Sequence, residues 1–87
     1  MAAMESITEE ELYRYCRVDT DEQKALALQL AETCEAELLA KGIPLTASSM
    51  LLFGLTVKAM TLHEMDHPGE ELPRGIREKI NDLKFNY

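Results

Sequence analysis

The sequence is poor in residues that interrupt helices and in residues that form disulfides or metal clusters. Its 87 residues include three prolines, four glycines, two cysteines, three tyrosines, two phenylalanines and no tryptophan. Leu, Ala, Glu and Lys are abundant, and this composition favours helix. Cys16 and Cys34 lack C-x-x-C spacing, so we expect reduced thiols buried in a core.

A membrane-spanning segment and an export signal are also missing from the sequence. The apolar run around residues 47–62 is shorter than the ~20 residues that cross a bilayer, and it contains Lys58. Residues 1–6 have neither a basic nor an apolar segment of the kind that directs secretion, and we expect this end to be flexible. The prediction is one soluble, cytoplasmic domain over residues 1–87.

Positive charge is scarce outside the C-terminal end of the chain. The formal net charge is −7, and residues 1–45 contain ten acidic and four basic residues. Residues 73–87 contain two acidic and four basic residues, a local charge of +2. Because nucleic-acid binding requires Lys and Arg against phosphates, the acidic body argues against specific binding to DNA or RNA. The basic end is compatible with docking on an acidic protein partner.

Capping patterns and hydrophobic periodicity predict an all-α fold, a small four-helix domain without strands. Thr8 is the expected N-cap of the first helix, and Glu11 completes a capping box three residues later. This helix is predicted to be short and to stop near Arg17.

The second helix is predicted to be long, with Asp19 or Thr20 as its cap and Lys41 near its end, because Gly42 follows. Its apolar face repeats at three- and four-residue steps. The expected members of that face are Ala27, Leu30, Ala31, Cys34 and Leu38. The residues expected mostly elsewhere are Glu22, Lys24, Glu32, Glu35 and Glu37.

The third helix is expected to start at Thr46 or Ser48 and to be largely buried. It carries apolar side chains around nearly its whole circumference, with Lys58 among them. A domain of this size rarely surrounds a helix so completely. The side that holds Lys58 is therefore either a subunit interface or an internally buried face from which Lys58 extends to solvent. The candidate interface residues are Leu51, Leu55, Lys58 and Leu62.

The fourth helix is predicted after the break at Pro68 and Gly69, with Pro73 in its first turn. Apolar residues recur along it at i, i+4, i+7 and i+11, which is typical of one buried stripe. These residues are Ile76, Ile80, Leu83 and Tyr87.

The end of the third helix matches the H-E-x-x-H pattern through His63, Glu64 and His67. In zinc peptidases the two imidazoles share the metal and the glutamate is the general base. A third ligand is also required, and no His or Cys follows His67. The sequence has no glycine-rich phosphate loop and no nucleophile motif. We expect no catalytic residue, metal or cofactor, and zinc binding by these three residues remains the alternative.

Three stretches, in order along the chain, resemble motifs of a known family. They are Tyr15-Cys16-Arg17-Val18-Asp19-Thr20-Asp21-Glu22, then Leu62-His63-Glu64-Met65-Asp66-His67-Pro68-Gly69, then Leu72-Pro73-Arg74-Gly75-Ile76 closing on Ile80-Asn81-Asp82-Leu83-Lys84. Over about residues 12–84 the chain is similar to the head–tail connector (adaptor) family of tailed bacteriophages and prophages, also labelled DNA-packaging proteins. It departs from the family pattern at Glu64, Met65, His67 and Pro68, where members usually carry aromatics and then Asn-Arg.

The resemblance implies a structural virion protein without enzymatic activity, assembled in the host bacterial cytoplasm and placed at the head–tail junction. Its subunits would form a ring under the portal protein, extend the DNA channel and meet head-completion or tail proteins. The family's C-terminal segment is associated with portal docking, which here implies Lys84, Phe85, Asn86 and Tyr87. The alternative is a small helical DNA-packaging accessory or regulator, which would need a basic recognition face.

Overall fold

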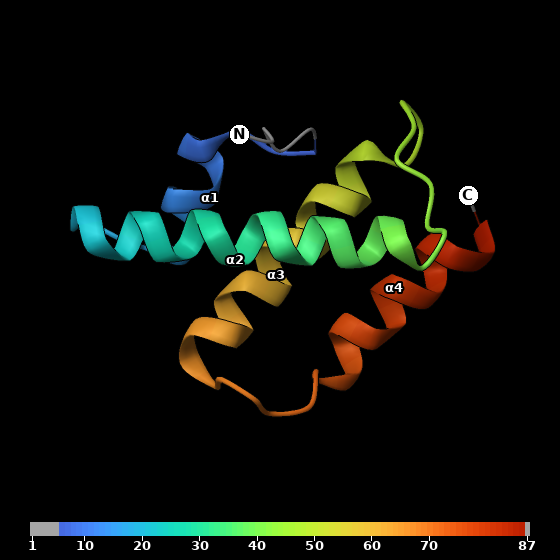
Figure 1. The fold of residues 1–87 in the computed structure, drawn as a ribbon. Coiled ribbons are helices and arrows are strands. Elements are labelled where there is room, and N and C mark those ends of the chain that lie inside the picture. The colour runs from blue at the N-terminus through green and yellow to red at the C-terminus, as the bar shows by residue number, and fades with distance from the viewer. Residues whose placement is uncertain (1–5, 87) are drawn as a thin grey trace.

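The computed structural model describes residues 6–86, which form four α-helices and contain no strand. The helices are α1 (Glu9–Cys16), α2 (Asp21–Ala40), α3 (Met50–Asp66) and α4 (Arg74–Asn86). The predicted all-α class is confirmed. Helix α3 is central because it packs against α1, α2 and α4, while α2 crosses in front of it in Figure 1.

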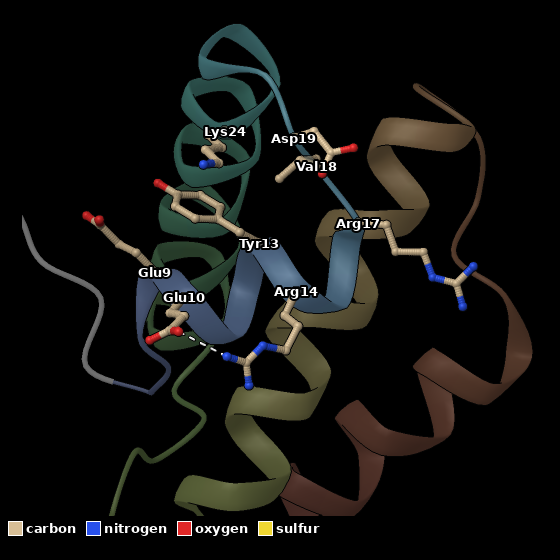
Figure 2. Close-up of a pocket in the computed structure, with 8 residues that line it drawn as sticks. All are labelled: Glu9, Glu10, Tyr13, Arg14, Arg17, Val18, Asp19 and Lys24. Carbon is tan, nitrogen blue, oxygen red and sulfur yellow. Dashed lines mark hydrogen bonds and ion pairs between the residues drawn. The ribbon is translucent and has the colours of Figure 1, made fainter.

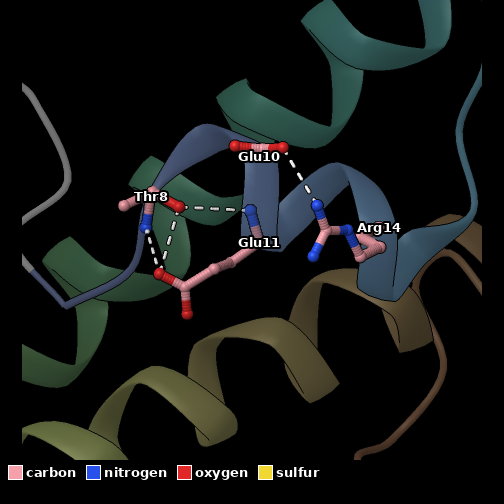
Figure 3. A network of polar contacts seen from close by, with 4 residues as sticks. All are labelled: Thr8, Glu10, Glu11 and Arg14. Atoms are coloured by element: carbon pink, nitrogen blue, oxygen red, sulfur yellow. Dashed lines mark hydrogen bonds and ion pairs between the residues drawn. The ribbon is translucent and has the colours of Figure 1, made fainter.

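Helix α1 begins with the predicted capping box. The Thr8 hydroxyl accepts from the Glu11 N–H at 3.2 Å, and the Thr8 N–H donates to Glu11 Oε1 at 3.3 Å (Figure 3). The Thr8 hydroxyl also donates to that carboxylate at 3.0 Å. These hydrogen bonds, followed by the charges of Lys58 and Arg14, lower the pKa of Glu11. The helix ends at Cys16, and the next residue, Arg17, turns the chain with a left-handed φ of 56°.

Helix α2 is capped by Thr20, whose hydroxyl accepts from the Gln23 N–H at 3.2 Å. Of the two predicted caps, Thr20 is therefore the one used. The helix ends one residue before Lys41, and Gly42 follows with a φ of 81°, as its position after the helix predicted. The predicted apolar face is inward, with Leu30 half-buried and the other four members buried.

One residue of α2 departs from its predicted position. Glu35 was expected on the polar side of the helix, yet it is only 7% exposed. The reason is that Ser6, which is distant in the sequence, lies against Glu35 in the fold. Glu35 Oε2 accepts from the Ser6 hydroxyl at 2.6 Å and from the Ser6 N–H at 3.2 Å. The prediction made from α2 alone was wrong because Ser6, in the segment that precedes α1, covers this carboxylate.

The same segment passes very close to α3 at Gly54. A Cβ on Gly54 would lie 2.8 Å from the Ser6 carbonyl oxygen and 2.7 Å from Cγ2 of Ile7, which is buried. Only glycine leaves room for this approach. We call Ser6 and Ile7 the N-terminal strap. Residues 1–5 of the predicted flexible end lie outside the described residues.

Helix α3 starts two to four residues later than predicted, and α4 starts one residue after Pro73. Helix α3 begins at Met50 because Thr46 and Ser49 form a hydrogen-bonded turn instead of the first helical turn. The Ser49 hydroxyl donates to the Pro44 carbonyl at 3.0 Å, and it makes no capping bond to the helix. Pro73 immediately precedes α4, where its carbonyl accepts from Ile76 and Arg77 N–H groups at 3.1 Å.

The core lies where α3 meets its three neighbours, and it includes both cysteine side chains as free, buried thiols. The prediction of reduced, buried cysteines is confirmed. From α4, Ile76 and Leu83 enter the core and Ile80 packs beside it, whereas Tyr87 lies outside the described residues. Among residues 6–86, no helix has the length and apolarity needed to cross a membrane.

Candidate assembly surface and docking segment

One side of α3 carries apolar side chains that the described residues leave exposed at its start and partly cover toward Leu62, which packs against the core. Leu51 is 91% exposed and Leu55 is 38% exposed, and Lys58 and Leu62 are half-buried. Phe53 and Val57, on the other side of the helix, have no exposed surface. We call Leu51, Leu55, Lys58 and Leu62 the α3 outer face. Of the two interpretations of this face, internal burial is wrong for its first half because no element of the described chain covers Leu51.

Tyr15 of α1 borders the α3 outer face. The Lys58 Nζ lies 5.5 Å from the centroid of the Tyr15 ring, which is a cation–π distance. Tyr15 is itself 37% exposed. The sequence alone does not place Tyr15 here, because it and Lys58 are far apart in the chain and belong to different helices. The ring extends the apolar area and lies beneath the lysine ammonium group.

The C-terminal end of α4 presents another exposed apolar side chain. Phe85 is 76% exposed, and the Lys84 Nζ lies 5.8 Å from its ring centroid. Asn86 is also exposed. These three residues form the described part of the predicted docking segment, and Tyr87 lies outside the described residues. An exposed aromatic ring beside a lysine suits an apolar partner surface with acidic groups around it.

The histidine pair has local structural partners. The His63 and His67 ring centroids lie 5.4 Å apart. His67 Nδ1 is 3.0 Å from Glu70 Oε2, and His63 Nε2 is 3.4 Å from the Glu70 carbonyl oxygen. Glu64, the base of the zinc pattern, accepts from the Gly69 N–H at 3.4 Å. Among residues 6–86, no group of three or more His, Cys, Asp or Glu side chains is arranged to hold a metal ion.

The two thiols are poor nucleophiles. Burial raises the pKa of Cys34 to about 11, with a smaller contribution from the Glu37 carboxylate. Burial, followed by the charge of Asp66, also raises the pKa of Cys16. Both groups are therefore protonated at neutral pH, whereas the thiolate is the reactive form.

An open hollow of about 560 Å³ lies between α1 and the start of α2. Figure 2 shows its lining residues, Glu9, Glu10, Tyr13, Arg14, Arg17, Val18, Asp19 and Lys24. Three of these side chains are basic and three are acidic, and the Arg14–Glu10 pair is closed at 2.9 Å. The hollow thus presents no potential of one sign that would select a charged ligand. Its Tyr13 ring is already covered by Lys24, at 5.6 Å from the centroid.

Comparisons with protein-family models, curated proteins and solved structures each found no significant match.

Proposed function

We infer that this chain is a structural subunit that assembles through the α3 outer face into a ring, in the manner of a phage head–tail connector. The observation that carries the proposal is Leu51. A leucine left 91% exposed, in line with a second exposed leucine on a helix whose other side is core, is a site for another protein surface. The resemblance of the motifs over residues 12–84 supplies the identity of the assembly.

The charge distribution supports the same proposal. Residues 1–45 carry six more acidic than basic residues, as ten against four, and such a body can stand beside DNA in a channel without gripping it. Residues 73–87 carry two more basic than acidic residues, and the exposed Phe85 lies near their end. This end suits docking on an acidic portal surface. The subunit would then join the portal to head-completion or tail proteins, without enzymatic activity, at the head–tail junction.

The test is assembly of the purified chain, alone and mixed with the portal protein of the same virus. Native mass spectrometry gives the subunit number, and negative-stain electron microscopy shows whether the assembly is a closed ring. We expect rings in at least one of the two conditions. A chain that stays monomeric alone and never binds the portal would overturn the proposal.

Two variants separate the roles of the two surfaces. Leu51→Asp places a charge on the α3 outer face and is expected to abolish rings, with Met50→Asp as the matched control. Met50 is the adjacent residue, is also exposed, and lies 100° around the helix from Leu51. Phe85→Ser is expected to leave subunit contacts intact and to weaken portal binding at least tenfold. If Leu51→Asp and Phe85→Ser changed ring formation to the same extent, and also changed portal binding to the same extent, this division of roles would be contradicted.

A further inference from the structure

A groove of about 260 Å³ lies between α2, α3 and the loop that leads to α4. Its floor is apolar, because Met60 is buried and Leu30 and Leu72 are half-buried. Every charged side chain that lines the groove is a carboxylate, and these carboxylates form its rim. They are Glu37 from α2, Glu64 from α3 and Glu70 from the loop. We call these six residues the acidic groove.

The rim carboxylates come close together and can accept further hydrogen bonds. Burial, followed by the charge of Glu37 and then that of Glu64, raises the pKa of the Cys34 thiol, which also lines the groove. Glu64 accepts a backbone N–H at 3.4 Å, and Glu70 Oε2 lies 3.0 Å from His67 Nδ1. A carboxylate has about four acceptor sites. Within residues 6–86, none of the three rim carboxylates forms an ion pair with a lysine or an arginine.

An apolar floor below an acidic rim matches the side chain of arginine or lysine. Each has an apolar stem that packs on apolar surface and a cationic head that reaches a polar edge. The arginine head also fits a carboxylate with two parallel hydrogen bonds. The volume lies just below the ~300–1,000 Å³ of small-molecule sites, so the groove takes a side chain or two of a peptide and not a whole helix. Unlike the mixed hollow beside α1, its rim has charge of one sign, which selects a cation.

Leu26 extends the apolar surface beyond the groove. It lies one turn before Leu30 on α2, about 40° around the helix from it, and it is 48% exposed. An apolar side chain next to the inserted cation would cover Leu26. The surface as a whole is therefore complementary to a segment that is both basic and apolar.

The acidic groove is separate from the two surfaces assigned above. At 100° per residue, Met60 and Glu64 lie about 150–170° around α3 from the middle of the α3 outer face. The docking segment begins at Lys84, about 15 Å along α4 from Arg74, at the end of the helix nearer Leu72. A contact in the groove therefore leaves both other surfaces free.

We propose that the acidic groove binds a segment of another protein that inserts an arginine or lysine side chain over Met60, between the rim carboxylates, and lays a neighbouring apolar side chain on Leu26. This inference goes beyond the proposed function, which assigns no residue to a third partner. It does not depend on whether the chain forms rings.

Peptide binding to the full wild-type chain tests the proposal. The probe is an acetylated and amidated peptide of sequence Ser-Leu-Arg-Leu-Ser, and the measurement is NMR of carbon-13 methyl labels on methionine. The Met60 signal is expected to shift, and the signal of Met50, about 15 Å away along α3, to stay. Replacing the arginine of the peptide by glutamine, or both its leucines by glycine, is expected to weaken binding at least tenfold. Equal binding of the three peptides, or no shift of Met60, would overturn the proposal.

Variants of the chain locate the binding site independently of the peptide. The double variant Glu37→Gln and Glu64→Gln keeps the shape of both side chains and is expected to weaken binding at least tenfold. Glu32→Gln is the matched control, since Glu32 lies 140° around α2 from Glu37, and it is expected to bind like wild type. Circular dichroism checks that each variant is folded. Equal affinity of the double variant and wild type would place the peptide elsewhere and overturn the proposal.

A second copy of this chain is the competing occupant, because Lys84 and Phe85 also form a basic and apolar pair. Dilution of the wild-type chain without peptide tests it. We expect the Met60 signal to be independent of concentration. A shift on concentration that Phe85→Ser abolishes would show a second copy in the groove and overturn the proposal. None of these outcomes bears on ring formation, so the proposed function is tested separately.

Discussion

The close approach of the N-terminal strap to α3 predicts that Gly54→Ala destabilises a helix that alanine should otherwise favour. Inside a helix, alanine is about 1 kcal/mol better than glycine. At Gly54, however, the new Cβ lies 2.7 Å from Ile7 Cγ2 and 2.8 Å from the Ser6 carbonyl oxygen. Carbon atoms pack at about 3.5–4.0 Å, so the strap must move by about 1 Å.

The size of the effect follows from three contributions. Overpacking of this kind costs about 1–3 kcal/mol, and the helix preference of alanine offsets about 1 kcal/mol of it. If the strap detached completely, the protein would lose the burial of Ile7, about 1.5–3 kcal/mol, and the Ser6 hydrogen bonds to Glu35. The destabilisation cannot exceed this cost, because the strap would detach first. We expect Gly54→Ala to lower the free energy of unfolding by about 1 kcal/mol, and by no more than about 2 kcal/mol.

The matched control is Gly75→Ala in α4. A Cβ at Gly75 meets nothing within 4 Å, so this variant is expected to gain a few tenths of a kcal/mol, up to about 1 kcal/mol. Urea unfolding followed by circular dichroism at 222 nm measures both. The Leu51→Asp background keeps self-association from adding to the measured stability.

Opposite signs for the two glycine variants are the expected result. A gain at Gly54 equal to the gain at Gly75 would refute the close approach of the strap. Ile7→Ala provides a further check, because it removes the methyl group that the new Cβ meets. The loss from Gly54→Ala should shrink in that background, which a double-mutant cycle measures as coupling.

Two further predictions concern the α1 cap and the buried thiol. Thr8→Ala removes the hydroxyl that accepts from the Glu11 N–H, and it is expected to lower the free energy of unfolding in urea by about 1 kcal/mol. Thr8→Asn keeps a capping oxygen and is the control. An equal loss of unfolding free energy in both variants would argue against the cap. Cys34 has its pKa raised by burial from 9.0 to about 11, so the folded state holds its proton more tightly. Its contribution is present below about pH 9 and is lost as the pH rises through about 11, a fall of about 2–3 kcal/mol. Cys34→Ala should flatten the decline of unfolding free energy between those pH values, and a decline unchanged by the substitution would exclude the thiol as its cause.

Local sequence was enough to predict the fold class and most of the helix ends. The capping box joins Thr8 to Glu11 within a single turn, and Gly42 takes the positive φ that ends a helix. Each depends on residues a few positions apart, and so it can be recognised from spacing alone. The start of α3 could not be recognised from spacing alone, because the Ser49 hydroxyl bonds to the Pro44 carbonyl instead of capping the helix.

The sequence by itself determined which residues share the α3 outer face, because 100° per residue places Leu51, Leu55 and Lys58 on one side of any helix. Only the tertiary structure decided that the described residues leave Leu51 exposed and that Lys58 is half-buried beside Tyr15. Burial depends on what packs against a side chain, and the packing partners come from distant parts of the chain. Glu35 shows the same limit in reverse, since periodicity left it out of the predicted apolar face and Ser6, 29 residues away, covers it.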